Sequence, residues 1–351
     1  MNSFNNAGKL TPKDFDIYIF PYLGASNKKV IVGPKHGVDA AVVDLGDKLM
    51  VVAEDPTFGL PSLGFKKFGW AIVHICCSDV ACLAAKPEFM TICLLLPPET
   101  PKSVLLDVMT TMDAECKNLG VSLIGGHTGV VPGISYPLNG GCTVFGFTTK
   151  DKLIVPSGAK VGDLVIVTKG AAVEATSILA LQYPTGLEEK FGTTLVKNAQ
   201  DMFYDMTVVK DALIAREIQG VSAMHDATEG GVLGGIYEVG NASNIGMKIF
   251  KDRIILTEEA DKICDFFEID PYFSISEGTL IITVDKDNAE DVLNALKQEN
   301  IKASIVGECV DKNRGMQLFE RGQRIGTFKF PDTDPFWAAY FKAIQYSEEI
   351  K

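Results

Sequence analysis

The hydrophobic positions along this chain follow two periods that alternate with each other. Short runs of apolar and β-branched residues predict strands at 30–32, 40–45, 48–54, 89–96, 121–125 and 141–148. Longer segments with helical spacing lie between them, at 66–85 and at 101–119, where a proline opens the helix. Interleaved strands and helices of this kind predict layers of α and β elements in the first half of the chain.

The second half repeats the mixed pattern after an interruption at 150–162, where proline and glycine break the periodicity. Further strands are expected at 163–168, 221–225, 279–284, 303–308 and 324–330, and helices at 173–182, within 197–219, at 230–241 and at 288–300. We therefore predict an α/β (α+β) architecture of two domains, at 1–155 and 156–331, followed by a helical tail at 332–351.

The tail places large apolar residues on one helical face, namely Phe336, Trp337, Tyr340, Phe341 and Ile344. Such a stripe either packs on the body of the protein or binds a partner, and packing is the expected role.

Composition limits the classes of partner. The 351 residues include 46% hydrophobic residues, enough to bury two cores, and carry a formal net charge of −12. Without a run of lysine or arginine, nonspecific attraction to nucleic acid or to an anionic membrane is not expected. No apolar run approaches the roughly 18 residues of a membrane span, and residues 1–16 are polar. The expected location is the cytoplasm.

The eight cysteines form no CxxC pair and lie mostly in apolar segments, which predicts reduced core residues. Cys76, Cys77 and Cys82 are the only close group, and a zinc or redox role for them is the alternative.

Two short motifs place an aspartate beside small residues. Asp39 lies in Gly-Val-Asp-Ala-Ala at 37–41, and Asp226 lies in His-Asp-Ala-Thr-Glu-Gly-Gly at 225–231. Carboxylate oxygens are the ligands that hard cations prefer, and glycine-rich turns offer main-chain N–H groups to phosphate. The motifs together indicate a metal and nucleotide-phosphate site, although each alone is also compatible with an ordinary turn.

Two more aspartates stand in unusual positions. Asp79 lies in the apolar helical stretch 70–85, where an unpaired carboxylate would cost several kcal/mol. We expect it to contact a metal or substrate; a hydrogen bond to the backbone or to His74 is the alternative. Asp55 is expected at the end of a strand, before Pro56, where either a ligand contact or a plain turn is compatible with the sequence.

Five motifs occur in the order seen in the aminoimidazole ribonucleotide synthetase (PurM-like) superfamily, and they span nearly the whole chain. They are Gly37-Val-Asp-Ala-Ala-Val-Val43, Glu54-Asp55-Pro56, Ser78-Asp79-Val-Ala81, Gly125-Gly-His-Thr128 and His225-Asp-Ala-Thr-Glu-Gly-Gly231. Within the superfamily the chain most resembles the HypE-like hydrogenase maturation factors; selenophosphate synthetase and thiamine monophosphate kinase are more distant relatives.

The resemblance implies an N-terminal domain that pairs with a second subunit into a barrel, giving a homodimer, and ATP bound in a cleft beside the C-terminal domain. It implies that four aspartates hold Mg²⁺ on the ATP phosphates, namely Asp39, Asp55, Asp79 and Asp226. It also implies that Gly125, Gly126, Thr128, Gly230 and Gly231 line the nucleotide. No Walker A sequence is present.

The implied chemistry is ATP-dependent phosphorylation of an amide or similar oxygen, followed by dehydration or ring closure. HypE carries its substrate carbamoyl group on its own C-terminal cysteine, whereas the last cysteine here is Cys309, so we expect the group to be presented in trans by a small molecule or another protein. Glu229, where HypE commonly has arginine, and Val38, where relatives often have an acidic residue, are further departures. The alternatives are a nucleotide-binding module without turnover and a small-molecule kinase.

Three histidines lie within or beside the motifs, and a group that titrates near neutral pH suits proton transfer. The candidate catalytic residues are Asp79, His127 and Asp226, with His127 as the acid or base. His36 and His225 are weaker candidates for that role, and hydrogen bonding within a loop is the alternative for all three histidines. His74 is expected to be a satisfied core residue.

Overall fold

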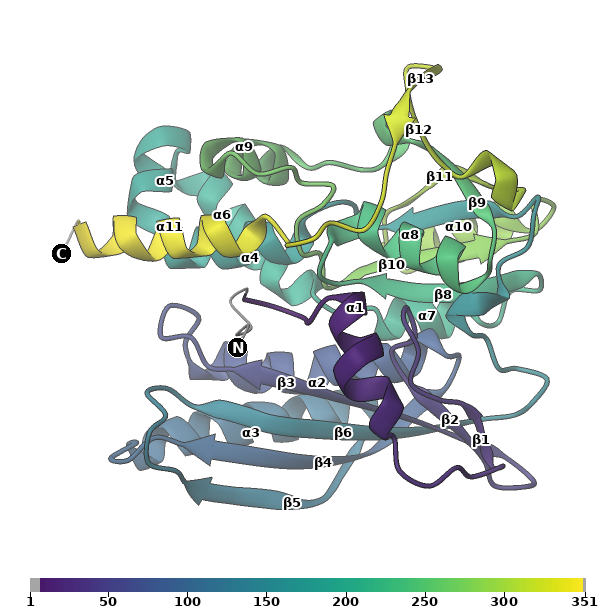
Figure 1. Cartoon of the computed structure of the whole chain (residues 1–351). Helices are drawn as coiled ribbons and strands as arrows, with labels where there is room; N and C mark the ends of the chain where they lie inside the picture. Colours follow the sequence, from purple (N-terminus) through teal and green to yellow (C-terminus); the bar gives the residue numbers. More distant parts are fainter. Residues whose placement is uncertain (1–6, 350–351) are drawn as a thin grey trace.

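The computed structural model describes residues 7–349, with the side chain of Phe58 left aside. Two sheets lie one above the other with helices between and beside them (Figure 1). The first sheet has six strands in the order β1-β2-β3-β6-β4-β5, and the second has seven in the order β13-β12-β9-β11-β7-β10-β8. Each half of the chain thus contributes one sheet.

The first sheet is formed by β1 (Val30–Val32), β2 (Ala41–Asp44), β3 (Leu49–Phe58), β4 (Lys86–Leu96), β5 (Ser122–Val130) and β6 (Leu138–Thr148). Its neighbours are antiparallel except β4 and β5, which are parallel because α3 (Lys102–Leu119) connects them. In β4 and β6 buried and half-buried positions largely alternate, so one face of the sheet packs on helices.

The second sheet is formed by β7 (Leu164–Thr168), β8 (Val221–Ala227), β9 (Gly246–Phe250), β10 (Thr279–Val284), β11 (Ala303–Val310), β12 (Met316–Glu320) and β13 (Gln323–Thr327). β10 is buried along its whole length, as expected for a strand covered on both faces. One face carries α8 (Gly231–Ala242), and the other faces α7 (Val209–Ala215) and α10 (Ala289–Gln298).

A group of helices lies at one end of the second sheet (Figure 1). It contains α4 (Val173–Gln182), α5 (Pro184–Phe191), α6 (Thr193–Asp201), α9 (Glu258–Phe267) and α11 (Phe336–Glu349), which share one hydrophobic core. None of the described helices is long and apolar enough to cross a membrane.

The central helix α2 (Phe65–Cys82) packs against β3 and β6 of the first sheet and against α7 and β8 of the second. Gly69 allows α3 to approach closely, because a Cβ atom there would lie 2.6 Å from the main-chain oxygen of Val108. Ser78 ties α2 to the second half by accepting a 3.0 Å hydrogen bond from the main-chain N–H of Val208. Its neighbour Asp79 is therefore held at the boundary between the two halves.

The alternating pattern located most elements correctly, with informative differences. β3 continues to Phe58, so the expectation that Asp55 ends a strand was wrong. The strand passes Pro56 because its register against β6 shifts between Asp55 and Thr57, and such an irregularity tolerates the missing N–H of proline. Strands β9 and β12 and helices α5 and α9 were not predicted.

The tail packs on the body of the protein, as expected. Phe336 and Tyr340 of α11 are buried among α4 and α9, and Trp337 and Ile344 are half-buried there. Phe341 departs from the predicted face and is 56% exposed.

Candidate functional site

Four aspartates from four separate segments converge where the two halves meet. Asp39 precedes β2, Asp55 lies in β3, Asp79 lies in the last turns of α2, and Asp226 lies near the end of β8. The charges of Asp55, Asp226 and Asp39 all act on Asp79. The structure thus brings together every aspartate that the sequence motifs singled out.

Asp226 is the most enclosed of the four, with no exposed surface. Its Oδ1 atom accepts a 3.6 Å hydrogen bond from the thiol of Cys82, whereas its Oδ2 atom is buried without a partner among the described residues. Burial, followed by the charge of Asp39, raises the pKa of Asp226 to about 6. A buried carboxylate oxygen with nothing to bind is costly, and a cation would satisfy it.

Asp39 is held by His225, the residue before Asp226. His225 Nδ1 lies 2.6 Å from Asp39 Oδ2, and His225 Nε2 lies 3.1 Å from Glu238 Oε2 on α8. Burial opposes a charge on the ring, but the two carboxylates outweigh it and raise the pKa of His225 well above its ordinary value. Burial likewise opposes the charge of Asp39, yet the charge and hydrogen bond of His225 lower the pKa of that carboxyl.

In this arrangement some polar atoms are open to a cation and others are already engaged. One potential ligand atom from each of Asp39, His225 and Asp226 lies within 4.8 Å of the others. Because both ring nitrogens of His225 are already engaged with carboxylates, the carboxylate oxygens are the atoms that remain for a cation. His225 orients Asp39 instead, as hydrogen-bonding neighbours of metal ligands commonly do.

Asp55 and Asp79 complete the acidic cluster. Burial raises the pKa of Asp55 to about 6, and burial together with the charge of Asp55 raises the pKa of Asp79 well above its ordinary value. His74 does not compensate Asp79, because its ring nitrogens lie 3.1 Å from Thr207 and from Glu115 and its ring stacks on Trp70. The suggestion of a hydrogen bond to His74 was therefore wrong, and the expected core role of His74 is confirmed.

The residues present fit Mg²⁺. The donors are hard carboxylate oxygens, His225 and Lys9 offset only part of their mutual repulsion, and one of them has no partner. Asp39, Asp55, Asp79 and Asp226 are the residues that would hold the ion.

Two glutamates next to the aspartates were missed by the sequence reasoning. Glu277 is 3% exposed, lies just before β10, and has a buried Oε1 atom without a partner. Burial, then the charge of Asp226, raises its pKa well above the ordinary value. Its main-chain N–H donates to Glu174 Oε2 at 3.1 Å, and burial raises the pKa of Glu174 to about 8. The available signal was Glu277-Gly278 before a buried strand, a carboxylate beside a small residue as at Asp226.

Gly230 and Gly231 begin α8 beside the cluster. Their φ angles are +85° and +62°, and a Cβ atom on Gly231 would lie 2.6 Å from the main-chain oxygen of Ser274. The N–H of Gly230 already donates to Asp334 Oδ2 at 2.7 Å. These glycines are adjacent to Asp226, and their role toward a nucleotide stays a prediction.

The residues of the Gly-Gly-His-Thr motif lie apart from the aspartates of the same chain. Gly125, Gly126, His127 and Thr128 are exposed on β5, at the edge of the first sheet. β4 and β6 stand between β5 and β3, which separates them by about 14 Å at ordinary strand spacing. His36 also stands aside, with its Nε2 atom 3.0 Å from Asp16.

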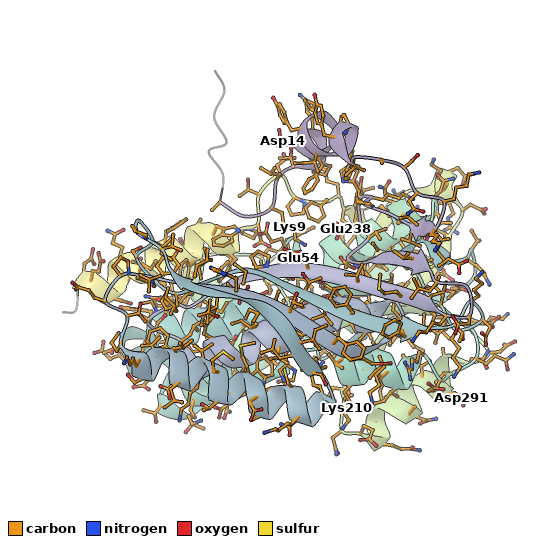
Figure 2. The ribbon with its side chains drawn as sticks, turned by 90° about the horizontal axis from the view of Figure 1, so that it is seen from below. Lys9, Asp14, Glu54, Lys210, Glu238 and Asp291 are labelled. Carbon is orange, nitrogen blue, oxygen red and sulfur yellow. The ribbon has the colours of Figure 1, made fainter. Side chains whose placement is uncertain are left out.

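The N-terminal segment reaches the cluster from the other direction. Lys9 lies beside Glu238 in Figure 2, and its ammonium group donates to Thr228 Oγ1 at 3.1 Å. The residue as a whole is exposed, although its ammonium group is bonded to that hydroxyl. Loss of water opposes its charge, yet the carboxylates of Glu238 and three of the aspartates raise the pKa of Lys9. Sequence reasoning did not single out this lysine.

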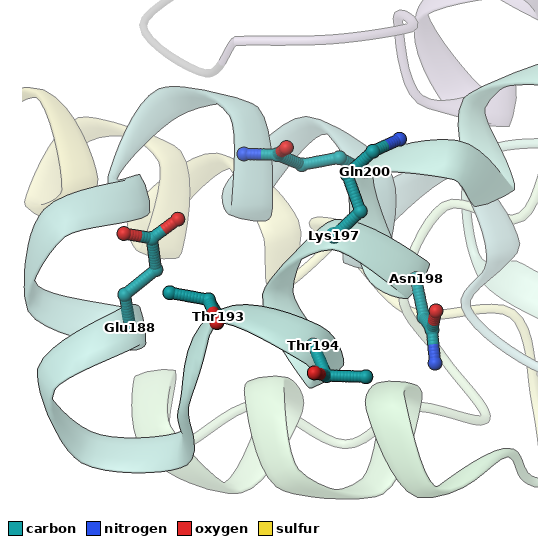
Figure 3. A pocket seen from close by; sticks show the side chains of 6 residues that line it. All are labelled: Glu188, Thr193, Thr194, Lys197, Asn198 and Gln200. Carbon is teal, nitrogen blue, oxygen red and sulfur yellow. The ribbon is translucent and has the colours of Figure 1, made fainter.

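A shallow hollow of about 420 Å³ lies between α5 and α6, lined by Glu188, Thr193, Thr194, Lys197, Asn198 and Gln200 (Figure 3). Lys197 is paired there with Asp201 at 2.6 Å, and none of the four clustered aspartates lines the hollow. We therefore take the aspartates as the candidate functional site.

The fold and site define a two-sheet α/β protein with a buried carboxylate cluster suited to a hard cation. Family models match it in two blocks, the N-terminal domain of AIR synthase related protein at residues 37–149 and the C-terminal domain at residues 160–316. The chain belongs to the AIR synthase related protein family, and within it the chain is HypE-like.

Individual proteins support this placement. A putative hydrogenase expression/formation protein of Methanocaldococcus jannaschii, MJ0676, is 26% identical over 282 residues, covering 79% of this chain and 81% of the relative. The carbamoyl dehydratase HypE of Escherichia coli is 26% identical over 251 residues, covering 69% of each.

Solved structures share the fold. HypE in a HypE–HypF complex superposes with a TM-score of 0.66 at 19% identity, covering 83% of this chain and 93% of the other. AaThiL complexed with AMPPCP and TMP gives 0.67 at 17% identity, covering 82% and 89%. At these identities the likeness concerns the fold alone.

Proposed function

We propose that this chain is an ATP- and magnesium-dependent enzyme that phosphorylates the oxygen of a carboxamide presented by another molecule. The observation that carries the proposal is the convergence of four aspartates on a buried Asp226 oxygen without a partner. A relative named carbamoyl dehydratase and a fold neighbour complexed with an ATP analogue support the same chemistry.

The proposed reaction forms and breaks a defined set of bonds. The carboxamide oxygen attacks the terminal phosphorus of ATP, and ADP leaves. One N–H proton is lost as the O-phosphorylated imidate forms, and loss of the second N–H proton then expels phosphate and leaves a nitrile. Carboxamide and ATP thus become nitrile, ADP and hydrogen phosphate, with one proton released. Bound magnesium supplies charge neutralisation at the phosphate oxygens.

The chain's own residues have separate tasks in this scheme. The aspartates hold the metal, and His225 keeps Asp39 oriented through its 2.6 Å contact. Glu277 is the proposed proton acceptor, because burial and the neighbouring charge of Asp226 make its carboxylate a stronger base than one in water. Its unpartnered Oε1 atom is free to receive the N–H proton.

A substrate presented in trans agrees with the state of the cysteines. Seven of the eight are buried, and Cys93 is half-buried in β4. Cys309 lies in β11 with its Sγ atom 3.7 Å from Met247 Sδ, so it cannot carry a group into the site without unfolding its strand.

We further propose that two copies pair through the first sheet. Leu123, Ile124 and Val130 of β5 are 39%, 58% and 62% exposed, an unusual density of large apolar side chains on one edge strand. In such a homodimer β5 of the partner would bring the Gly-Gly-His-Thr motif to the nucleotide, which the separation within one chain does not allow.

The test uses phosphate release and product analysis with a peptide that carries S-carbamoylcysteine. The proposal expects equal amounts of ADP, phosphate and S-cyanylated peptide, with all three lost in Asp226→Asn and retained in Asp113→Asn, an exposed control paired with Lys117. A stable phosphorylated product without phosphate release would instead make the protein a kinase. Nucleotide binding without any turnover of carboxamides would make it a binding module.

A further inference from the structure

The N-terminal segment is hydrogen-bonded to Glu229, three residues after Asp226 of the acidic cluster. Both carboxylate oxygens of Glu229 accept the main-chain N–H of Lys9, at 3.1 and 2.9 Å. Gly8 fits only as glycine: its φ is +96°, and a Cβ atom there would lie 2.6 Å from both Glu229 Oε2 and Trp337 Nε1. We call residues 8–11 the strap.

The hydrogen bonds between the Lys9 main chain and Glu229 restrict the position of the Lys9 side chain. Because the main chain of Lys9 is bound by Glu229, its ammonium group reaches Thr228 Oγ1 at 3.1 Å and acts on the neighbouring carboxylates. In Figure 2 the residue lies beside Glu238, below the helix α1 (Pro12–Asp14) that carries Asp14. The strap therefore places the positive charge of Lys9 near the carboxylates of the cluster.

The charge of the Lys9 side chain suggests a role in addition to the main-chain contact with Glu229. A triphosphate brought to four aspartates needs cationic contacts in addition to metal, because the carboxylates repel it. Lys9 is the lysine whose charge acts on Asp39, Asp55 and Asp226. A lysine ammonium is a compact point charge that suits phosphate oxygens.

Resting on the proposed function, we propose that Lys9 is a phosphate-binding residue that contacts the terminal phosphate of the nucleotide, and that Glu229 positions it through the strap. The side chain turns from Thr228 to the phosphate without release of the main chain. Lys9 thereby makes the site prefer a triphosphate to a diphosphate. Binding of the strap would explain why position 229 is glutamate here, where HypE commonly has arginine.

The experiment measures nucleotide affinity by calorimetry rather than turnover. Full-length wild type, Lys9→Met and Lys13→Met are titrated with a nonhydrolysable ATP analogue and with ADP, each with Mg²⁺. Lys13 lies four residues along the same segment and is exposed, so Lys13→Met is the matched control. We expect Lys9→Met to weaken analogue binding at least about ten-fold, as loss of a charged hydrogen bond does, and ADP binding much less.

Three further measurements separate phosphate contact from a merely structural role. Lys9→Arg should restore part of the preference for the analogue, and the analogue should protect Lys9 of the wild type from amine acylation, read by mass spectrometry. Glu229→Ala should reduce the preference as Lys9→Met does, with little added effect in the double variant.

The outcomes are distinct. Equal analogue affinity in wild type and Lys9→Met, or equal losses for analogue and ADP, would overturn the inference while the proposed function stands. Absence of magnesium-dependent analogue binding in the wild type would overturn both.

Discussion

Removing one charge from the cluster should stabilise the metal-free protein while removing its function. In Asp226→Asn the side-chain oxygen can still accept the thiol of Cys82, and the new amide can donate to neighbouring carboxylates. The folded-state pKa of Asp226 is about 6 against an ordinary 3.8. A difference of about two pKa units corresponds to roughly 3 kcal/mol of destabilisation at pH 8.

That figure is an upper bound for the variant, because the remaining aspartates adjust their protonation when one charge is gone. We expect a gain of about 1–2 kcal/mol, or roughly 2–4 °C in the unfolding temperature. The assay is thermal unfolding in chelator at pH 8, beside Asp113→Asn, whose side chain is 62% exposed and should leave the temperature unchanged.

The pH dependence follows from the direction of the shift. A carboxyl whose pKa is raised by folding destabilises the protein as pH rises from about 4 through 6, since the unfolded chain releases the proton first. The advantage of Asp226→Asn should therefore be full at pH 8 and vanish near pH 4. If Asp226→Asn has a lower unfolding temperature than the wild type at pH 8 without metal, the account of net repulsion within the cluster is refuted.

Three other predictions concern residues around the cluster. Glu277→Gln should lower phosphate release at least about 100-fold while leaving analogue binding intact, and parallel loss of binding would contradict its role as proton acceptor. Glu174→Gln should flatten the loss of stability between about pH 4.5 and 8, because the pKa of Glu174 is raised to about 8; an unchanged unfolding profile would contradict this burial. Asp334→Ala removes the acceptor of two main-chain N–H groups at the starts of α8 and α11 and should cost about 2–4 kcal/mol by denaturant unfolding, whereas the exposed Asp332→Ala should cost little.

The predictable part of the site was local in sequence. Asp39 and Asp226 stood beside small residues, and Asp79 stood out because an ionised group in an apolar helix demands compensation. Those signals depend on short-range patterns, and the structure brings their residues together. Asp55 was correctly expected among these aspartates, but it lies within β3 and not at its end. The register shift that lets β3 continue past Pro56 depends on pairing with β6, which the local sequence does not show.

The missed part depended on long-range contacts. Lys9 meets Glu229 across 220 residues of sequence, and its segment has no hydrophobic period to mark it. The expectation for His127 came from a motif, but its strand lies at the far edge of the sheet, where one chain cannot bring it to the aspartates. Sheet order is decided by pairing between distant strands, which a local pattern does not encode.

The most direct test of the central claim is calorimetric titration of the folded protein with a nonhydrolysable ATP analogue, with and without Mg²⁺, beside Asp79→Asn and Asp113→Asn. The account predicts binding that requires Mg²⁺, is lost in Asp79→Asn and is kept in Asp113→Asn. Binding that ignores Mg²⁺, or that survives unchanged in Asp79→Asn, would contradict the assignment of the aspartates as a metal and nucleotide site.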